Sequence, residues 1–345
     1  MDTIQLLHDR LRFVGLPAER LGQVSEAVRS GASWRAACRP HARLARTAAL
    51  AARAAGRRTR ATALWIQTAA WRHASAFDLH DTTTSGWRPE TARRLRATAV
   101  AAFSRAVDLG GSAPRHVRIG HGQSAMDGYL LTPAGPSLGA VVLLNGLDSM
   151  CECELYRLAR RLTRFRLHAL LLDVPAGYRS GTPCLALEGR ASAIADWLEQ
   201  QTCSRLVVAM GVSFGGHFAA RLASGDGRFV RTVMVSPGAW IDPVSRLDAR
   251  LRRMAEVTLT IAGTSPLSDA LPRCDIRDVP PPQGQLLLYA MSRDALFGVE
   301  HEHAYIAWAR SRIEVRRVDA EHAGTSRMAH WLPAAARWLS TGVTP

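Results

Sequence analysis

A Gly-x-Ser-x-Gly motif over residues 211–215 presents Ser213 as a candidate nucleophile. An apolar run at 205–210, typical of a buried strand, precedes the motif, and a helical pattern at 214–224 follows it. The glycines allow the strand to turn sharply into the helix, which holds the serine in a strained and exposed position. The positive end of the following helix favours negative charge near the serine. This context predicts a reactive serine rather than a packing turn of small residues.

A serine hydroxyl is a weak nucleophile, so it needs a base, and the base needs an orienting acid. In proteins with this strand–turn–helix arrangement the acid and then the histidine follow the serine, each after a later strand. Asp294 follows a predicted strand at 285–290, and His322 follows another at 312–318. We therefore predict a catalytic triad of Ser213, Asp294 and His322.

Other residues compete for these two roles. Asp319 is the rival acid, but it lies on the histidine's own loop. His217 lies one turn into the helix after the serine, too near in sequence to reach back over it. The remaining histidines considered as bases lie in helical patterns and are expected at the surface: His301, His303 and His330.

Attack on a carbonyl also requires preorganised donors for the oxyanion. The backbone N–H of Phe214, directly after the nucleophile, is predicted to be one donor. The loop after the strand 140–145 is predicted to supply the second, with Leu147 preferred and Gly146 as the alternative. An ordinary strand-to-helix turn is the competing interpretation of that loop.

The pattern of the whole second part of the chain predicts the fold that must position these residues. Two runs at 116–121 and 126–132 indicate a hairpin. After it, strand and helix patterns alternate, which is typical of a mostly parallel sheet covered on both faces. The predicted strands are 140–145, 167–173, 205–210, 230–236, 285–290 and 312–318, and the predicted helices are 152–165, 184–202, 214–224, 299–309 and 326–340.

Residues 3–108 show helical periodicity and no strand-like alternation. They divide into about five helices, with breakers at 15–17, Gly31, Pro40, Gly56 and 82–89. The pattern changes near 110–114. We therefore predict a helical domain at 1–112 and a catalytic α/β domain at 113–345, with an insertion at about 237–283 over the edge where the strands end.

The chain has 345 residues and a net charge of +15, and all 44 of its basic residues are arginine. The absence of lysine excludes Schiff-base chemistry and a Walker A phosphate loop. Residues 1–115 carry +11 of the net charge. Their arginines are scattered through alanine-rich helical patterns without a nucleic-acid-binding motif. Solvated helices are therefore favoured, an anionic substrate or an acidic protein partner is the alternative, and a nucleic-acid partner is not expected.

The sequence predicts neither a metal site nor a cofactor nor a membrane segment. Cys151 and Cys153 form a CxC pair without the spacing of a zinc site. No apolar run reaches the roughly 18 residues that a membrane span needs. The charged N-terminus lacks the apolar core of a signal peptide. A reduced, cytoplasmic protein is expected.

Three segments together resemble the FrsA-like α/β-hydrolases. LLNGLDSMCECELYRLARRL resembles their GGLDS segment, LLLDVPAGYRSG their D-x-P-G-x-G segment, and AARAAGRRTRATALWIQTAAWRHASAFDL their N-terminal helical lid. Two positions depart from the pattern. Asn145 stands where the family often has glycine, and residues 176–179 lack the acidic residue that usually ends the second segment.

The resemblance implies an α/β-hydrolase fold, with an eight-stranded, mostly parallel sheet and a helical lid. It implies hydrolysis of a carbon–carbon bond next to a ketone, or of an ester, through an acyl-enzyme and without a cofactor. A non-hydrolytic acyltransferase or cyclase with the same serine site is the first alternative. A non-catalytic binding or regulatory protein is the second. Relatives with such lids often dimerise, so the resemblance also allows a homodimer.

A small-molecule substrate that is aromatic, anionic or carrier-tethered fits this interpretation. Asp148 and Tyr178, in the two family-like segments, are candidates for contacting it. Trp65 and Trp71 are candidates for lining an aromatic pocket, with helical core as the competing role. Asp242 is the candidate for an extra lid-side carboxylate that some relatives use, with a helix cap as its competing role.

Overall fold

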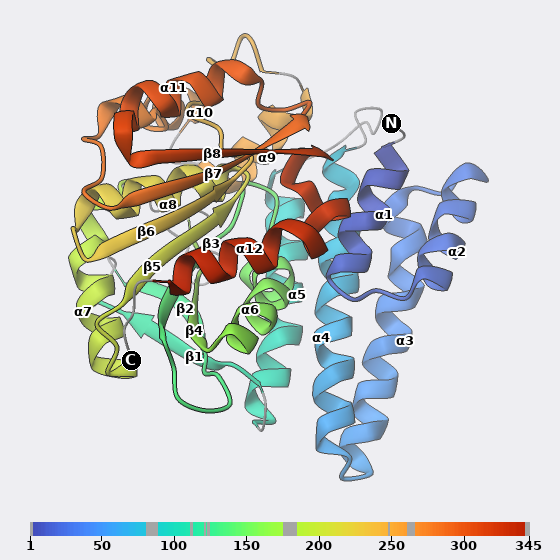
Figure 1. The fold of residues 1–345 in the computed structure, drawn as a ribbon. Coiled ribbons are helices and arrows are strands. Elements are labelled where there is room, and N and C mark those ends of the chain that lie inside the picture. Colours follow the sequence, from blue (N-terminus) through green and yellow to red (C-terminus); the bar gives the residue numbers. More distant parts are fainter. Residues whose placement is uncertain are drawn as a thin grey trace.

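The computed structural model describes residues 3–80, 89–110, 113–120, 122, 125–174, 185–247, 249–260 and 266–341. N-terminal helices stand beside a sheet that carries helices on both faces (Figure 1). The N-terminal helices are α1 (Thr3–Phe13), α2 (Ala18–Arg29), α3 (Trp34–Ala54), α4 (Arg58–Ala74) and α5 (Pro89–Asp108). Within the described residues, no helix has the length and apolar character needed to cross a membrane.

Helices α3 and α4 form a long antiparallel hairpin that turns at Gly56, where φ is +70°. The prediction that Pro40 ends a helix is wrong, because Pro40 lies inside α3. Proline removes one backbone donor, which leaves the Ala36 carbonyl without its helical partner. Ala36 is exposed, so water can bind that carbonyl. Packing of α3 along α4 then keeps the helix continuous.

The sheet has eight strands in the order β1-β2-β4-β3-β5-β6-β7-β8. β1 pairs antiparallel with β2, and β2 with β4, while every other neighbouring pair is parallel. The predicted hairpin and the mostly parallel sheet are therefore confirmed. The strands are β1 (Arg115–Ile119), β2 (Met126–Leu131), β3 (Gly139–Leu144), β4 (Leu167–Leu172), β5 (Val207–Val212), β6 (Phe229–Val235), β7 (Gln285–Arg293) and β8 (Ile313–Glu321).

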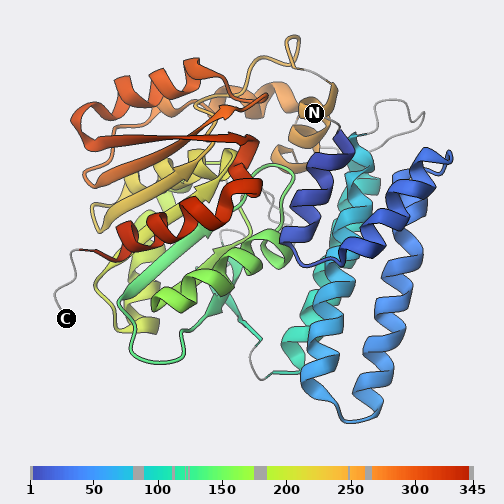
Figure 2. The same cartoon turned by 45° about the vertical axis from the view of Figure 1, so that its right-hand side comes forward.

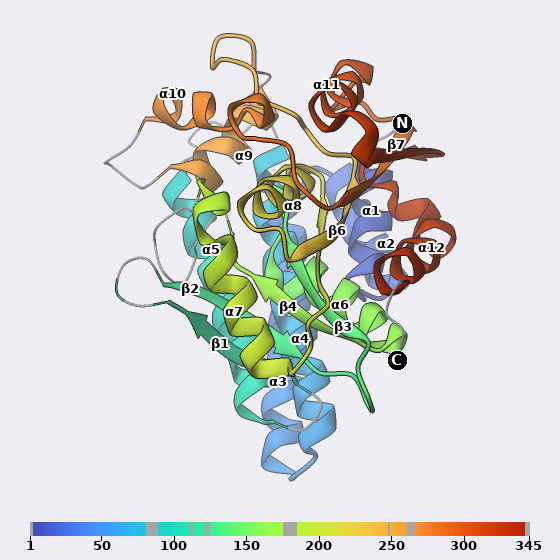
Figure 3. The ribbon, with the colours of Figure 1, turned by 60° about the vertical axis from the view of Figure 1, so that its left-hand side comes forward.

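Side chains alternate between the two faces of the sheet, as the pleat requires. Val141 and Leu143 of β3 face a core formed with α6 (Tyr156–Leu162) and α12 (Met328–Ser340). Val142 and Leu144 face a second core formed with α7 (Ala191–Thr202) and α8 (Phe214–Gly225). Figure 3 shows α7 on one side of the sheet and α12 on the other.

The N-terminal helices share the first of these cores. Trp65 of α4 and Phe103 of α5 are buried in it. The Phe103 ring meets the rings of Tyr129 and Tyr156 edge-on, with centroids 5.0 and 5.2 Å apart. Figure 2 shows the helices standing against this side of the sheet.

After β6, the described part of residues 237–283 includes α9 (Ala249–Leu259) and the short α10 (Leu267–Ala270). Arg93 of α5 donates hydrogen bonds to the Glu256 and Thr260 carbonyls at the end of α9. α11 (Val299–Ala309) follows β7. Because the carboxyl ends of the parallel strands meet at one edge, the loops after β3, β5, β7 and β8 all open there, between α1 and α9.

Candidate active site

Ser213 lies on a strained turn between β5 and α8, with φ +57° and ψ −137°. A Cβ atom at Gly211 would lie 1.9 Å from the Gly215 carbonyl oxygen. One at Gly215 would lie 2.3 Å from the Leu144 carbonyl oxygen. Both positions therefore require glycine, and the tight turn holds Ser213 at the start of α8 in a conformation that serine rarely adopts.

The structure brings Ser213, His322 and Asp294 into one hydrogen-bonded line. His322 Nε2 lies 2.8 Å from Ser213 Oγ. His322 Nδ1 lies 2.9 and 2.8 Å from the two carboxylate oxygens of Asp294. Because a carboxylate only accepts, Nδ1–H donates to Asp294, which leaves Nε2 free to accept the serine proton.

The surroundings of the Asp294 carboxylate favour its charged form. Its side chain is 5% exposed, and one of its oxygens accepts the N–H groups of Leu296 and Phe297 at 2.9 and 3.0 Å. Burial alone raises the pKa of Asp294. The hydrogen bond and charge of His322, together with the two amides, outweigh burial, so that its pKa lies below the ordinary value. A charged Asp294 fixes the orientation of the histidine ring.

The rival acid Asp319 lies elsewhere. Its side chain is 76% exposed, pairs with Arg293 at 3.0 Å and accepts a hydrogen bond from Ser292. Both oxygens of Asp294, not those of Asp319, face His322 Nδ1.

The competing histidines do not reach Ser213 either. His217 is buried in α8 and stacks on the Phe214 ring at 4.5 Å, and burial lowers its pKa to about 3. His303 and His330 are exposed, as predicted. The expectation of an exposed His301 is wrong, because this residue is buried, packs against the Trp240 ring and accepts the Ala239 N–H at 3.1 Å.

The loop after β3 lies directly against the serine. A Cβ atom at Gly146 would lie 3.3 Å from Ser213 Oγ. The Gly146 carbonyl accepts hydrogen bonds from Asn145 Nδ2 and Ser149 Oγ, at 3.1 and 3.3 Å. In a trans peptide the C=O and the N–H point in opposite directions. The Leu147 N–H therefore points away from these two side chains, an orientation that suits an oxyanion donor.

Asn145, which departs from the family-like pattern, braces this loop. It is fully buried, and its amide also donates to the Ser149 carbonyl at 3.2 Å. The Leu147 carbonyl accepts hydrogen bonds from Thr258 of α9 and Arg96 of α5. Hydrogen bonds from its own asparagine and from residues of α9 and α5 thus hold the loop in place.

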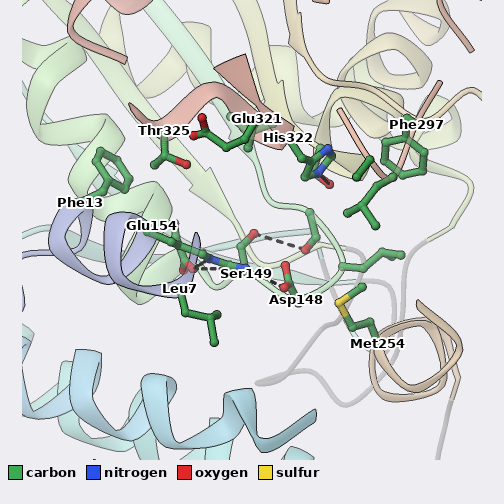
Figure 4. A pocket seen from close by; sticks show the side chains of 18 of the residues that line it. Leu7, Phe13, Asp148, Ser149, Glu154, Met254, Phe297, Glu321, His322 and Thr325 are labelled. Carbon is green, nitrogen blue, oxygen red and sulfur yellow. Dashed lines mark hydrogen bonds and ion pairs between the residues drawn. The ribbon is translucent and has the colours of Figure 1, made fainter. Parts of the chain in front are cut away.

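A cavity of about 550 Å³ extends from Ser213 and His322 to α1. Its walls are mostly apolar, and they come from α1 (Leu7, Phe13), α9 (Leu251, Met254) and the loop after β7 (Leu296, Phe297). In Figure 4, Leu7 and Phe13 lie across the hollow from Phe297. The volume lies within the range of small-molecule sites.

A partly buried charge cluster, visible in part in Figure 4, forms the α1 side of the cavity. Arg10 of α1 contacts Asp148 at 2.6 Å and Glu154 at 2.6 and 2.9 Å. His73 of α4 lies 2.9 Å from the same Glu154 oxygen, and the Met150 N–H donates to the other one at 3.1 Å. Burial raises the pKa of Glu154, but the neighbouring His73 and Arg10 outweigh it and lower the pKa to about 2.

Several predicted contact residues lie away from this cavity. Trp65 is buried in the core shared with the sheet, and Trp71 is buried among the N-terminal helices and stacks on His41, so the lining role suggested for them is wrong for this pocket. Asp242 is exposed and accepts the Trp240 indole N–H at 3.2 Å, so it neither caps a helix nor lines the cavity. Tyr178 lies outside the described residues. Asp148 does line the cavity.

The α1 contribution was not predicted. Leu7, Arg10 and Phe13 recur at helical spacing, but Arg10 lies 138 residues before Asp148 in the chain. Among the described residues, no group of three or more His, Cys, Asp or Glu side chains is placed to hold a metal ion.

An eight-stranded, mostly parallel sheet with a strained serine turn between β5 and α8 defines the α/β-hydrolase fold. Among solved structures, the chain is similar to a 2,6-dihydroxy-pseudo-oxynicotine hydrolase, with a TM-score of 0.80 and 16% identity over 96% of this chain and 94% of the other. Because that alignment covers nearly the whole chain, the shared fold includes the N-terminal helices.

Two further structures share parts of the fold. AbyA5 has a TM-score of 0.63 and 16% identity over 87% of this chain and 88% of its own. An esterase of Pyrococcus furiosus has a TM-score of 0.50 and 17% identity over 74% of this chain and 95% of its own. The sequence matches no protein-family model and no curated protein.

Proposed function

We propose that this protein is a serine hydrolase that cleaves a ketone-activated carbon–carbon bond or an ester through an acyl-enzyme. The observation that carries the proposal is the line from Asp294 through His322 to Ser213 Oγ, which ends at a strained turn facing the cavity. Similarity of fold to a 2,6-dihydroxy-pseudo-oxynicotine hydrolase and to an esterase supports it.

In the first half-reaction, Ser213 Oγ attacks the substrate carbonyl carbon while His322 Nε2 takes the hydroxyl proton. The backbone N–H groups of Phe214 and Leu147 stabilise the oxyanion. As the intermediate collapses, the bond to the leaving group breaks, and His322 returns the proton to that group. In the second half-reaction, His322 deprotonates a water molecule that attacks the acyl-serine, which releases an acid and restores the hydroxyl.

The cavity favours an uncharged and largely apolar substrate. Of the described residues that line it, the two arginines are both ion-paired, Arg10 with Asp148 and Glu154, and Arg293 with Asp319. An anionic group entering the cavity would compete with these carboxylates. An aromatic or polyketide-like ketone, or an ester of similar size, fits the apolar walls better than an anion does. For carbon–carbon cleavage, the substrate itself must stabilise the departing carbanion, as an enol or an electron-rich ring does.

The test is an incubation with β-diketones, aryl ketones and short esters in H₂¹⁸O, followed by mass spectrometry. A hydrolase incorporates one ¹⁸O atom into the acid product, and Ser213→Ala forms no product. Product formed without ¹⁸O would instead support an acyltransferase or cyclase. The absence of any turnover across the panel, together with no acyl-enzyme on Ser213, would favour a non-catalytic binding protein.

A further inference from the structure

Residues 27–77 contain ten arginines and no aspartate or glutamate. This segment includes all of α3 and α4. An arginine-rich composition alone does not explain it, because residues 116–345 carry 25 arginines together with 21 acidic residues. Acidic residues are thus missing from one structural unit, the α3–α4 hairpin.

Five arginines of α3 lie along one line. At 100° per residue they fall within an arc of about 80°, and they extend over about 27 Å of helix. All five are exposed, and we call them the arginine ridge: Arg35, Arg39, Arg43, Arg46 and Arg53. The buried residues of α3, among them Ala45, Ala49 and Ala52, lie on a different side of the helix from the ridge. Figures 1 and 2 show α3 at the outer edge of the molecule.

The positively charged side chains of the ridge repel one another. Like charges three or four residues apart on a helix are neighbours on its surface and destabilise it. Within the described part of the chain, no ridge arginine forms an ion pair, whereas Arg29 at the end of α2 pairs with Glu26. The positive charge of the ridge also affects a residue of α4. There, burial and then the charges of Arg46 and Arg105 lower the pKa of Arg72. An anionic partner along the ridge would relieve this repulsion.

We propose that the arginine ridge is a docking surface for an acidic, helical segment of a partner protein. Guanidinium groups pair with carboxylates through two parallel hydrogen bonds, and the regular spacing along α3 suits carboxylates on a second helix. Leu50, 40% exposed, lies within the same arc and offers an apolar contact. The hairpin tryptophans Trp34, Trp65 and Trp71 are buried, so they offer no ring on which a nucleic-acid base could stack.

The probe is an alanine-based helical peptide with five glutamates at the spacing of the ridge and one leucine. Its binding to the full-length protein is measured by fluorescence anisotropy. We expect the matched peptide to bind about tenfold more tightly than a scrambled peptide of the same composition. Arg43→Glu/Arg46→Glu should weaken the matched peptide by about tenfold or more.

The control is Arg164→Glu/Arg205→Glu, which makes the same change in net charge at two exposed arginines of the sheet-bearing part. It should retain wild-type binding, and both double variants should retain wild-type circular dichroism and turnover. Equal binding of matched and scrambled peptides, or equal loss in both double variants, would overturn the proposal. So would tighter binding of duplex DNA or phosphatidylglycerol vesicles than of the matched peptide.

Discussion

At the residue scale, the site depends on which carboxylate orients His322. Both oxygens of Asp294 lie within 2.9 Å of Nδ1, and two backbone amides fix that carboxylate in turn. Asp319, of the same type and three residues before His322, lies near the end of β8, points to solvent and pairs with Arg293. The chain therefore offers a matched pair of aspartates, one that contacts His322 and one that does not.

Asp294→Asn should lower kcat by about 10³-fold or more, because an amide can present its N–H to Nδ1 and stabilise the wrong tautomer of His322. Asp319→Asn should leave kcat within about twofold, since surface ion pairs contribute little. Steady-state kinetics of the two variants with one substrate measure the difference. Similar losses in both would contradict the assignment of Asp294.

At the element scale, α1 forms one wall of the cavity beside Ser213. Leu7 and Phe13 supply part of the cavity wall, and Arg10 fastens α1 to Asp148 of the loop after β3 and to Glu154. Asp148 is the next residue after Leu147, the proposed oxyanion donor. The position of α1 is therefore linked to the geometry around Ser213.

Arg10→Ala should destabilise the fold by about 2 kcal/mol, because it leaves two partly buried carboxylates without this cation. It should also raise KM, since Leu7 and Phe13 lose their anchor. Arg12→Ala, at an exposed position of the same helix, is the control and should change neither quantity. Urea unfolding and steady-state kinetics measure both effects. Wild-type behaviour of Arg10→Ala would show that α1 is held by its apolar contacts alone.

Glu154 makes the contribution of this charge cluster to the stability of the fold depend on pH. Its pKa lies near 2 in the folded protein against 4.5 ordinarily, so its stabilising effect is fully present above pH 4.5 and is lost as pH falls towards 2. The difference corresponds to about 3 kcal/mol. Urea unfolding between pH 7 and pH 3 should therefore show a shallower loss of stability in Glu154→Gln than in the wild type. Identical slopes would contradict the lowered pKa.

Features of the fold and the site that leave a local pattern in the sequence could be predicted. Buried strands show as apolar runs, and the order serine, acid, histidine follows from strands that all end at one edge of the sheet. Contacts between distant segments leave no such trace. The approach of Arg10 to Asp148, the burial of Trp65 in the shared core and the packing of His301 against Trp240 depend on how helices dock. The prediction that Pro40 ends a helix failed for the same reason, because tertiary packing keeps α3 continuous through this residue.

At the scale of the whole molecule, the helices and the sheet are one packing unit. Phe103 of α5 sits between Tyr129 of β2 and Tyr156 of α6, and Trp65 is buried in the same core. Removing the N-terminal helices would expose to water the part of this core that Trp65 and Phe103 cover. The proposed lid is therefore also part of the core.

A fragment of residues 113–345 should consequently lose cooperative unfolding, because large aromatic and aliphatic surfaces that α4 and α5 cover would be exposed. Urea titration followed by near-UV circular dichroism tests this against the full chain. A fragment with a sharp transition and native near-UV signal would show that the sheet-bearing part folds alone.

Ser213 is the proposed nucleophile, and covalent active-site labelling can identify the reactive side chain. A fluorophosphonate probe should add one covalent adduct per chain, and peptide mass spectrometry should locate it on Ser213. Ser213→Ala should remain unlabelled, and His322→Ala should label far more slowly, since no base is left to take the proton. An adduct on another residue, or no labelling of the folded wild-type protein, would contradict the account.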